Sequence, residues 1–170
     1  WITLRTLTGG VTTTADATIN SVTVGKGANS VSGNTVLGES ALDASVSGSN
    51  NTAIGNQVLT DLTSGVSNTG IGNDSLKSVT TGSRNVGLGA GALDTVTTAS
   101  NLTAVGTGAL TANTSGSSNV ATGYNSLDAN TTGSSNTGIG QNALGSNTTA
   151  DNNTALGRSA LALNTTGTQN

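Results

Sequence analysis

The sequence predicts an all-β fold, a parallel β-roll or β-solenoid made of seventeen-residue coils. A glycine and a leucine each recur every seventeen residues, and no insertion or deletion interrupts the period from Asn34 onward. A strict period of this length is typical of stacked repeats. The repeated positions are rich in Thr, Val, Ile, Gly and Asn, which are poor helix formers. No apolar stripe with helical spacing is present, so strands and turns are expected.

Two sets of positions define the period and carry its structural role. The marker glycine is found at Gly38, Gly55, Gly72, Gly89, Gly106, Gly123, Gly140 and Gly157. The leucine four positions later is found at Leu42, Leu59, Leu76, Leu93, Leu110, Leu127, Leu144 and Leu161. The repeat array therefore covers 34–170, with coils at 34–50, 51–67, 68–84, 85–101, 102–118, 119–135, 136–152 and 153–169. Equivalent residues of these coils are expected to stack above one another.

Residues 1–33 precede the array and are predicted to form an N-terminal β segment and cap. Residues 1–8 alternate apolar and polar side chains as an edge strand does, and Gly9 and Gly10 mark a turn or hinge. Residues 21–38 are interpreted as a shorter first coil, because terminal repeats that cap a stack are commonly atypical. We expect the whole chain to be a segment of a longer polypeptide.

Each coil is predicted to contain a strand that ends at its marker glycine, such as Thr52, Ala53 and Ile54. Successive residues of a strand point to opposite faces, so one face carries the bulky residues and the other carries only Ala, Gly or Val. We interpret the bulky column as core: Leu37, Ile54, Ile71, Leu88, Val105, Thr122, Ile139 and Leu156. Thr122 then marks a weak or hydrated layer. The nearly bare face is expected to admit another chain.

Glycine and asparagine form further columns. A second glycine column is replaced by alanine at Ala99 and Ala150, which should be strained if this corner requires a positive φ, or their coils should turn differently. Asparagine begins every coil except at Leu102, and a second asparagine column appears at Asn113, Asn130, Asn147 and Asn164. Stacked amides form ladders or bond to their own turns. The first column leaves both interpretations open, and the second favours turns.

The composition excludes several functions. With no His or Cys, the chain has no candidates for a nucleophile–base pair or a zinc site. Its eight acidic residues are scattered and form neither paired catalytic carboxylates nor a calcium cage. A net charge of −3 gives no basic surface for nucleic acid, and no apolar run approaches the ~18 residues that span a bilayer. We predict no enzyme activity, no cofactor, no metal, no nucleic-acid partner and no membrane insertion in this segment.

The position after the marker glycine is the most variable of the repeat, so we expect it to face outward. It carries the chain's only tyrosine, Tyr124, and a cation, Arg158. Both are candidates for surface contact with a sugar or a protein. An isolated surface aromatic without a partner is the alternative for Tyr124.

The sequence also predicts self-association. Each coil has about two large apolar side chains, which is little burial against the conformational entropy that ordering seventeen residues costs. Packing of copies through the Ala/Gly face would supply the missing burial, and a closed cyclic homo-oligomer would leave no open edges.

Short phrases of the repeat resemble a known family. NTAIG at 51–55, NTGIG at 68–72 and 136–140, and NTALG at 153–157 resemble the head repeats of YadA-type trimeric adhesins. The fuller unit, and DATINSVTVGKG at 16–27, are similar to repeats of bacteriophage tail-fibre proteins and related marine bacterial surface proteins. The resemblance covers nearly the whole chain and implies a left-handed β-roll in a homotrimeric fibre. The repeat is longer here, so the additional residues lie in a loop or widen each coil.

This resemblance implies a structural and adhesive role. The first expectation is the shaft of a bacteriophage tail fibre in the virion, which takes part in host attachment through a receptor such as a polysaccharide or an outer-surface protein. The alternative is the head of a trimeric adhesin on a bacterial cell surface. A third class is ice binding by a flat threonine array made of Thr35, Thr52, Thr69, Thr103, Thr137 and Thr154. Against it, these residues share a face with the predicted core.

Overall fold

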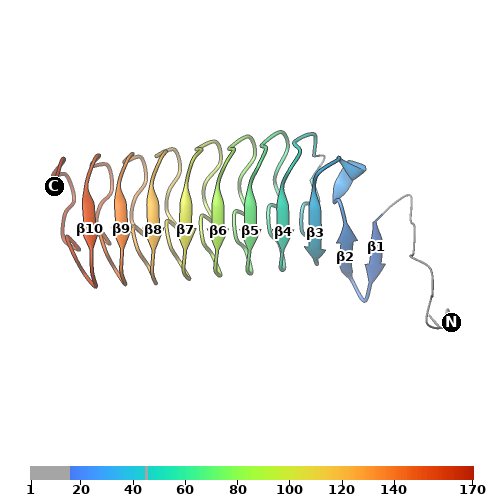
Figure 1. Cartoon of the computed structure of the whole chain (residues 1–170), viewed down its shortest axis with the longest axis horizontal. Helices are drawn as coiled ribbons and strands as arrows, with labels where there is room; N and C mark the ends of the chain where they lie inside the picture. The colour runs from blue at the N-terminus through green and yellow to red at the C-terminus, as the bar shows by residue number, and fades with distance from the viewer. Residues whose placement is uncertain (1–15, 45) are drawn as a thin grey trace.

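The structure is a computed structural model that describes residues 16–44 and 46–170. It is an elongated parallel β-solenoid with one ten-stranded sheet, whose strands lie side by side in chain order (Figure 1). The edge strand predicted over residues 1–8 and the hinge at Gly9 and Gly10 lie outside the described residues.

Strands β3 to β10 form the repeated part of the sheet. They are β3 (Thr35–Gly38), β4 (Thr52–Ile54), β5 (Thr69–Ile71), β6 (Val86–Leu88), β7 (Thr103–Val105), β8 (Val120–Thr122), β9 (Thr137–Ile139) and β10 (Thr154–Leu156). Each pairs in parallel with the next, in the register that a seventeen-residue step requires. The predicted all-β parallel solenoid of seventeen-residue coils is confirmed.

The N-terminal end of the sheet is built differently. Strands β1 (Ala17–Ile19) and β2 (Val22–Gly25) form an antiparallel pair, and β2 is also antiparallel to β3, with Val24 opposite Leu37. A short 3₁₀ turn, η1 (Ala28–Ser30), connects β2 to β3. Stacked coils would place successive strands in parallel. The shorter first coil predicted over 21–38 is therefore wrong, and this segment is part of an antiparallel meander.

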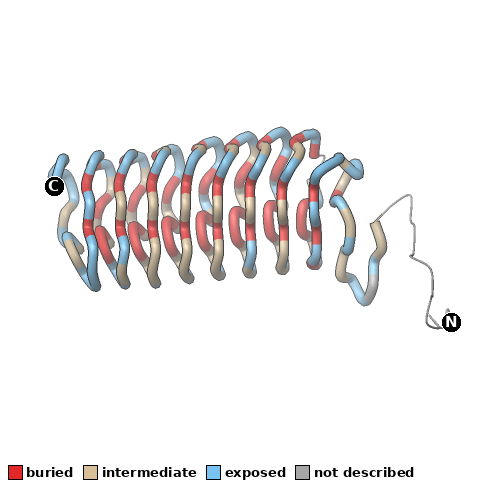
Figure 2. The backbone as a smooth tube through the Cα atoms, in the orientation of Figure 1, coloured by how far each residue is buried: buried red, intermediate tan, exposed pale blue. Residues whose placement is uncertain are grey.

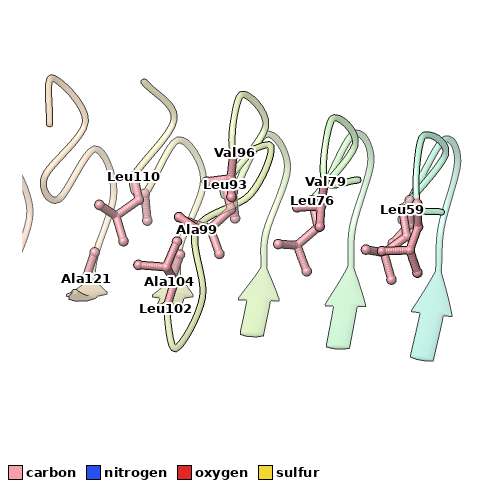
Figure 3. Packing of buried hydrophobic residues seen from close by; sticks show 14 of the residues in the cluster. Leu59, Leu76, Val79, Leu93, Val96, Ala99, Leu102, Ala104, Leu110 and Ala121 are labelled. Atoms are coloured by element: carbon pink, nitrogen blue, oxygen red, sulfur yellow. The ribbon is translucent and has the colours of Figure 1, made fainter. Parts of the chain in front are cut away.

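The coils are also bonded to one another outside the sheet. At the leucine column the backbone N–H of Leu42 donates to Val58 O at 2.9 Å, and that of Leu76 donates to Ala92 O at 3.0 Å. The column's leucines from Leu42 to Leu144 are fully buried and stack along the rod (Figure 3), whereas Leu161 in the last coil is 39% exposed. All eight leucines have φ between 49° and 59°, a left-handed conformation that the sequence alone did not indicate. The predicted leucine stack is confirmed.

The two faces of each strand are the reverse of the prediction. The small residues point inward: Ala53, Ala104 and Ala121 are fully buried, and Figure 3 shows Ala104 and Ala121 directed toward the leucine side of the coil. The bulky column lies outside, with Ile71 41% and Ile139 40% exposed. Buried and half-buried residues alternate along the strands accordingly (Figure 2).

The reason for this reversal is the narrowness of the coil. The sheet lies so close to the leucine side that a Cβ added to Gly87 would come within 3.1 Å of Leu76 Cγ. The Ala/Gly face is thus the interior of the chain and is not available for association. Thr122, expected to interrupt the core, lies on the outer face.

The inward strand residue is matched in size to the residue twelve positions earlier, which precedes the leucine of the neighbouring coil. A Cβ on Gly70 would clash with Val58 Cγ1, and a Cβ on Gly138 would lie 2.7 Å from Ser126 Oγ. Wherever the strand residue is alanine from β4 onward, its counterpart is also alanine. The glycine pairs are Val58/Gly70, Ser75/Gly87 and Ser126/Gly138, and the alanine pairs are Ala41/Ala53, Ala92/Ala104, Ala109/Ala121 and Ala143/Ala155.

The first asparagine column is a buried ladder that connects side chains to backbone. Asn68 is fully buried: its Oδ1 accepts the N–H of Asn85 at 3.0 Å, and its Nδ2 donates to Gly82 O at 2.9 Å. The same bonding recurs along the column. The backbone N–H of Leu102 donates to Asn85 Oδ1 at 3.0 Å, but its side chain cannot continue the ladder. There Asn113 of the second column donates to Gly116 O instead, at 2.8 Å. The second column begins in the coil where the first is interrupted.

The second asparagine column combines both interpretations. Asn130 Nδ2 donates to Asn113 Oδ1 at 2.7 Å and also to the turn carbonyl of Gly133 at 2.9 Å. Asn147 repeats this arrangement. The favoured bond within the turn is therefore present, and a ladder between coils coexists with it.

The two glycine columns have different causes. From Gly55 to Gly157 the marker glycines have φ of 119° to 139°, a region that L side chains rarely adopt. The second column does not have positive φ: a Cβ at Gly82 would instead meet the carbonyl oxygen of Ala99 in the next coil. Ala99 and Ala150 also lack positive φ, so the condition for their expected strain is not met.

Size matching predicts that a second substitution restores part of the stability lost through the first. Gly70→Ala should destabilise the rod by ~1–3 kcal/mol through overpacking against Val58, and Val58→Ala should destabilise it by leaving a cavity. The double variant recreates the Ala41/Ala53 pair, and urea denaturation should give a coupling free energy of about 1–2 kcal/mol. Val58→Ala combined with Gly138→Ala, which is several coils away, should be additive. Additive effects in the contacting pair would contradict size matching.

The ladder predicts a second, larger effect. Asn68→Ala leaves the Asn85 N–H and the Gly82 carbonyl without their partner, and should cost about 2–4 kcal/mol in thermal or urea unfolding. The control is Asn56→Ala. The exposed Asn56 side chain makes only surface bonds, accepting from Asn73 Nδ2 at 3.1 Å and donating to Glu39 Oε2 at 3.5 Å, so its loss should cost less than about 0.5 kcal/mol. Equal losses for the two variants would show that the ladder adds no stability.

Candidate functional site

The outer side of the sheet is a long surface without charge, which we call the sheet face. It consists of the outward columns of β3 to β10, and neither column contains a charged residue. One column is Thr35, Thr52, Thr69, Val86, Thr103, Val120, Thr137 and Thr154; the other is Leu37, Ile54, Ile71, Leu88, Val105, Thr122, Ile139 and Leu156. Val24, which pairs with Leu37 and is 42% exposed, extends the surface onto β2. The surface is uncharged, regular and solvent-facing, with threonines alongside aliphatic side chains.

Most charged residues lie on a different surface, the turn that follows each strand. We call it the turn edge and define it by the four columns that contain residues 39, 40, 43 and 44. It carries Glu39, Asp43, Asp61, Asp74, Lys77, Asp94, Asp128 and Arg158. These columns differ from coil to coil, whereas the stacked interior repeats. The turn edge is therefore where one coil is distinguished from another.

The two predicted contact residues both lie on the turn edge. Tyr124 is 54% exposed and Arg158 is exposed, as the variability of their column predicted. They are two coils apart in one column, with Gln141 between them. The structure thus places both on one surface, but each in a separate coil.

In the first five coils, some polar side chains of the turn edge are hydrogen-bonded to neighbouring coils. Lys77 Nζ lies 3.1 Å from Asp74 Oδ1 and donates to Gln57 Oε1 at 3.0 Å. Thr60 donates to Ser40 O at 3.0 Å, and Thr111 to Gly91 O at 3.1 Å. These contacts hold the edge side chains against the rod.

Two carboxyl groups of this edge have shifted pKa values. Burial raises the pKa of Asp94 above its usual value, the nearby Asp74 carboxylate raises it further, and Lys77 partly offsets both effects. Burial also raises the pKa of Asp128, opposed by hydrogen bonds from backbone amides. Both side chains are thus partly withdrawn from water, although they lie on a surface turn.

Among the described residues, hollows are found at two places along the turn edge. One, of about 340 Å³, lies beside the N-terminal meander and is lined by residues that include Asp16 and Asp43. The backbone N–H of Lys26 donates to the Asp16 carboxylate at 2.7 Å, so Asp16 has a structural role and connects the start of the meander to the residue that follows β2. The second, of about 270 Å³, lies in the last three coils and is lined by Asn125, Asp128, Asn142, Gly145, Ser146, Ala162 and Leu163.

Sequence reasoning missed the second hollow, although a signal existed. Gly145 is the only glycine in a column that otherwise reads Asp43, Thr60, Lys77, Asp94, Thr111, Asp128 and Ala162. A missing side chain at one position of an otherwise filled column leaves a gap beside its neighbours.

Comparison with known proteins adds no family assignment: no protein-family model, curated protein or solved structure matches this chain. Within residues 16–44 and 46–170, no three His, Cys, Asp or Glu side chains gather as a metal site would require. The same residues include no helix of the length and apolar character needed to cross a bilayer. The two surfaces of the rod are therefore the basis for the function.

The pKa shift of Asp94 predicts a pH-dependent change in stability. Because folding raises this pKa, ionisation disfavours the folded state at neutral pH, and the penalty disappears below the usual carboxyl pKa of ~3.9. Asp94→Asn should melt about 1–2 °C higher than the parent at pH 7 and at the same temperature near pH 3. Asp61→Asn, an exposed change on the same edge, serves as the control. A lower melting temperature for Asp94→Asn at pH 7 would contradict the shift.

Proposed function

We propose that this chain is the shaft of a homotrimeric, adhesive fibre, and that its sheet faces meet along the trimer axis. The supporting observation is the sheet face itself. It exposes Ile71, Ile139 and Leu37 by 40% or more, carries no charge in either outward column, and runs along eight parallel strands. Monomeric proteins rarely expose large apolar patches, so the exposed aliphatic column of this uncharged sheet supports a contact between copies. The proposal replaces the Ala/Gly face with the sheet face as the contact between copies.

The proposed arrangement assigns the two surfaces to two tasks. Packing the sheet faces of three copies against one another buries the outward Ile, Leu and Val side chains and covers the sheet. The turn edges, with their charged residues, Tyr124 and Arg158, then remain on the outside of the fibre. Binding through many weak contacts, repeated along three chains, gives avidity without requiring a strong single site.

Within this proposal, the resemblance of the repeat favours a bacteriophage tail fibre that takes part in host attachment, with left-handed coils and a virion location. The head of a trimeric adhesin on a bacterial cell surface is the alternative, since both use the same scaffold. The two differ in what lies beyond this segment. A virion-attachment or chaperone domain in the full-length protein would indicate the fibre, and a membrane anchor would indicate the adhesin.

One observation favours a second function, ice binding. The sequence suggested that the outward threonines share a face with the core. In the structure they lie instead with Ile, Leu and Val on a regular solvent-facing sheet. Val86 and Val120, which interrupt the threonine column, have the same branched shape. Ice binding needs this face to be free, whereas a trimer covers it. Thermal hysteresis of a monomeric chain would support ice binding, and its absence would remove this function.

The proposed trimer is tested by mass in solution. Light scattering on the purified chain should give three times its 16.3 kDa mass. Ile71→Asp places a carboxylate in the middle of the sheet face and should shift the mass toward a monomer, because an unpaired charge would be buried in the interface. Ala90→Asp, on the exposed turn edge, should remain trimeric. A monomeric parent would contradict the assembly, and a trimeric Ile71→Asp would exclude the sheet face as its interface.

A further inference from the structure

The 270 Å³ hollow at Gly145 is lined by residues from three successive coils of the turn edge. Among the described residues, the side chains of Asn125, Asn142 and Ser146 form no hydrogen bond with another residue, in contrast to Thr60, Lys77 and Thr111 in earlier coils. These side chains line the hollow beside Gly145, which has no side chain to fill it. The hollow therefore presents several polar side chains that have no hydrogen-bond partner among the described residues.

The lining of the hollow combines polar and apolar groups. Two carboxamides, one carboxylate and one hydroxyl supply both donors and acceptors. Gly145, Ala162 and the 89% exposed Leu163 supply an apolar boundary. Ligands that bear several hydroxyl groups on an apolar ring match such a lining. The volume is slightly below the roughly 300 Å³ at which pockets for drug-sized ligands begin, so it suits a single sugar ring.

Two other ligand classes fit less well. A calcium ion takes six to eight oxygen ligands in typical sites, and Asp128 is the only carboxylate in the lining. An anionic ligand would meet that carboxylate with no lysine or arginine in the lining to balance it. The lining thus selects for a neutral, hydroxyl-rich ligand.

We propose that the hollow formed by Asn125, Asp128, Asn142, Gly145 and Ser146 binds one neutral hexopyranose unit of a surface glycan. The ring lies against Gly145 and Ala162, and its hydroxyls bond to the carboxamides, the carboxylate and the serine. The biological meaning of this site rests on the proposed adhesive function, since it supplies one of the weak contacts that the fibre repeats. Tyr124 directly precedes Asn125 on the same turn and extends this surface with an exposed ring.

The test is a titration of the ¹⁵N-labelled full chain with the methyl α-glycosides of glucose, galactose and mannose and with N-acetylglucosamine, each separately. At least one should shift the amide signals of Asn125, Asn142 and Gly145 saturably, with a Kd of about 1 mM, as expected for one small weak site. N-acetylneuraminic acid, an anionic sugar, should leave these signals unchanged. Saturable shifts with none of the four neutral sugars would overturn the proposal.

Matched variants locate the site. Gly145→Thr fills the hollow with threonine, which already occurs in this column as Thr60 and Thr111. Gly145 has no positive φ that would prevent the substitution. It should weaken binding at least tenfold while amide signals elsewhere keep the parent's dispersion. Asp94→Asn, in the same column but away from the hollow, should bind as the parent does. Equal binding by Gly145→Thr and the parent would refute the site.

The two proposals fail separately. A monomeric mass together with sugar-dependent shifts at Gly145 would retain the sugar site and remove the trimeric fibre. A trimeric mass without such shifts would retain the fibre and remove this site.

Discussion

Each coil is hydrogen-bonded to the next through the same backbone groups, at the strand and at the turns on either side of it. The strand bonds run from β3 to β10, and the turn bonds include the Leu76 N–H to Ala92 O at 3.0 Å and the Thr63 N–H to Thr80 O at 2.9 Å. For these bonds to recur, every coil must repeat the same backbone conformation. The constraint explains why no residue is inserted or deleted in the array, and why the left-handed conformation of leucine recurs in all eight coils.

This constraint also determines at which positions the residue type can vary from coil to coil. Buried positions must fit the coil below, which gives the size-matched pairs and the asparagine ladders. Even the exception at Leu102 is balanced by Asn113, whose amide bonds to the carbonyl that the first column would otherwise have bound. The outward strand residues must remain regular because they belong to the same ladder. The turn edge is free to differ between coils, and most of the charged residues, Tyr124 and the hollow at Gly145 are found there.

Much of the fold could be predicted from the sequence, because a strict seventeen-residue repeat indicates that equivalent residues of successive coils stack on one another. The coil boundaries, the parallel pairing and the leucine stack follow from it. The period did not predict which face of each strand points into the core. Hydrophobicity favoured Ile54 and Ile71 as core residues, but the narrow coil admits only small inward residues such as Ala53 and Gly70. The alternating sizes of Val58/Gly70 and Ala41/Ala53 were a signal for the correct orientation. The hollow needed coordinates, since it depends on which neighbours surround Gly145.

The central claim is that the coils are bonded in register at a seventeen-residue step. Scalar couplings across hydrogen bonds, measured by NMR between a backbone nitrogen and a carbonyl carbon, test it most directly. If the coils are stacked, couplings are expected from Leu76 N to Ala92 C′ and from Leu127 N to Ala143 C′, whose hydrogen bonds are 3.0 and 2.9 Å long. Couplings from these nitrogens to carbonyls within their own coil, with none to the next coil, would contradict the stacked rod.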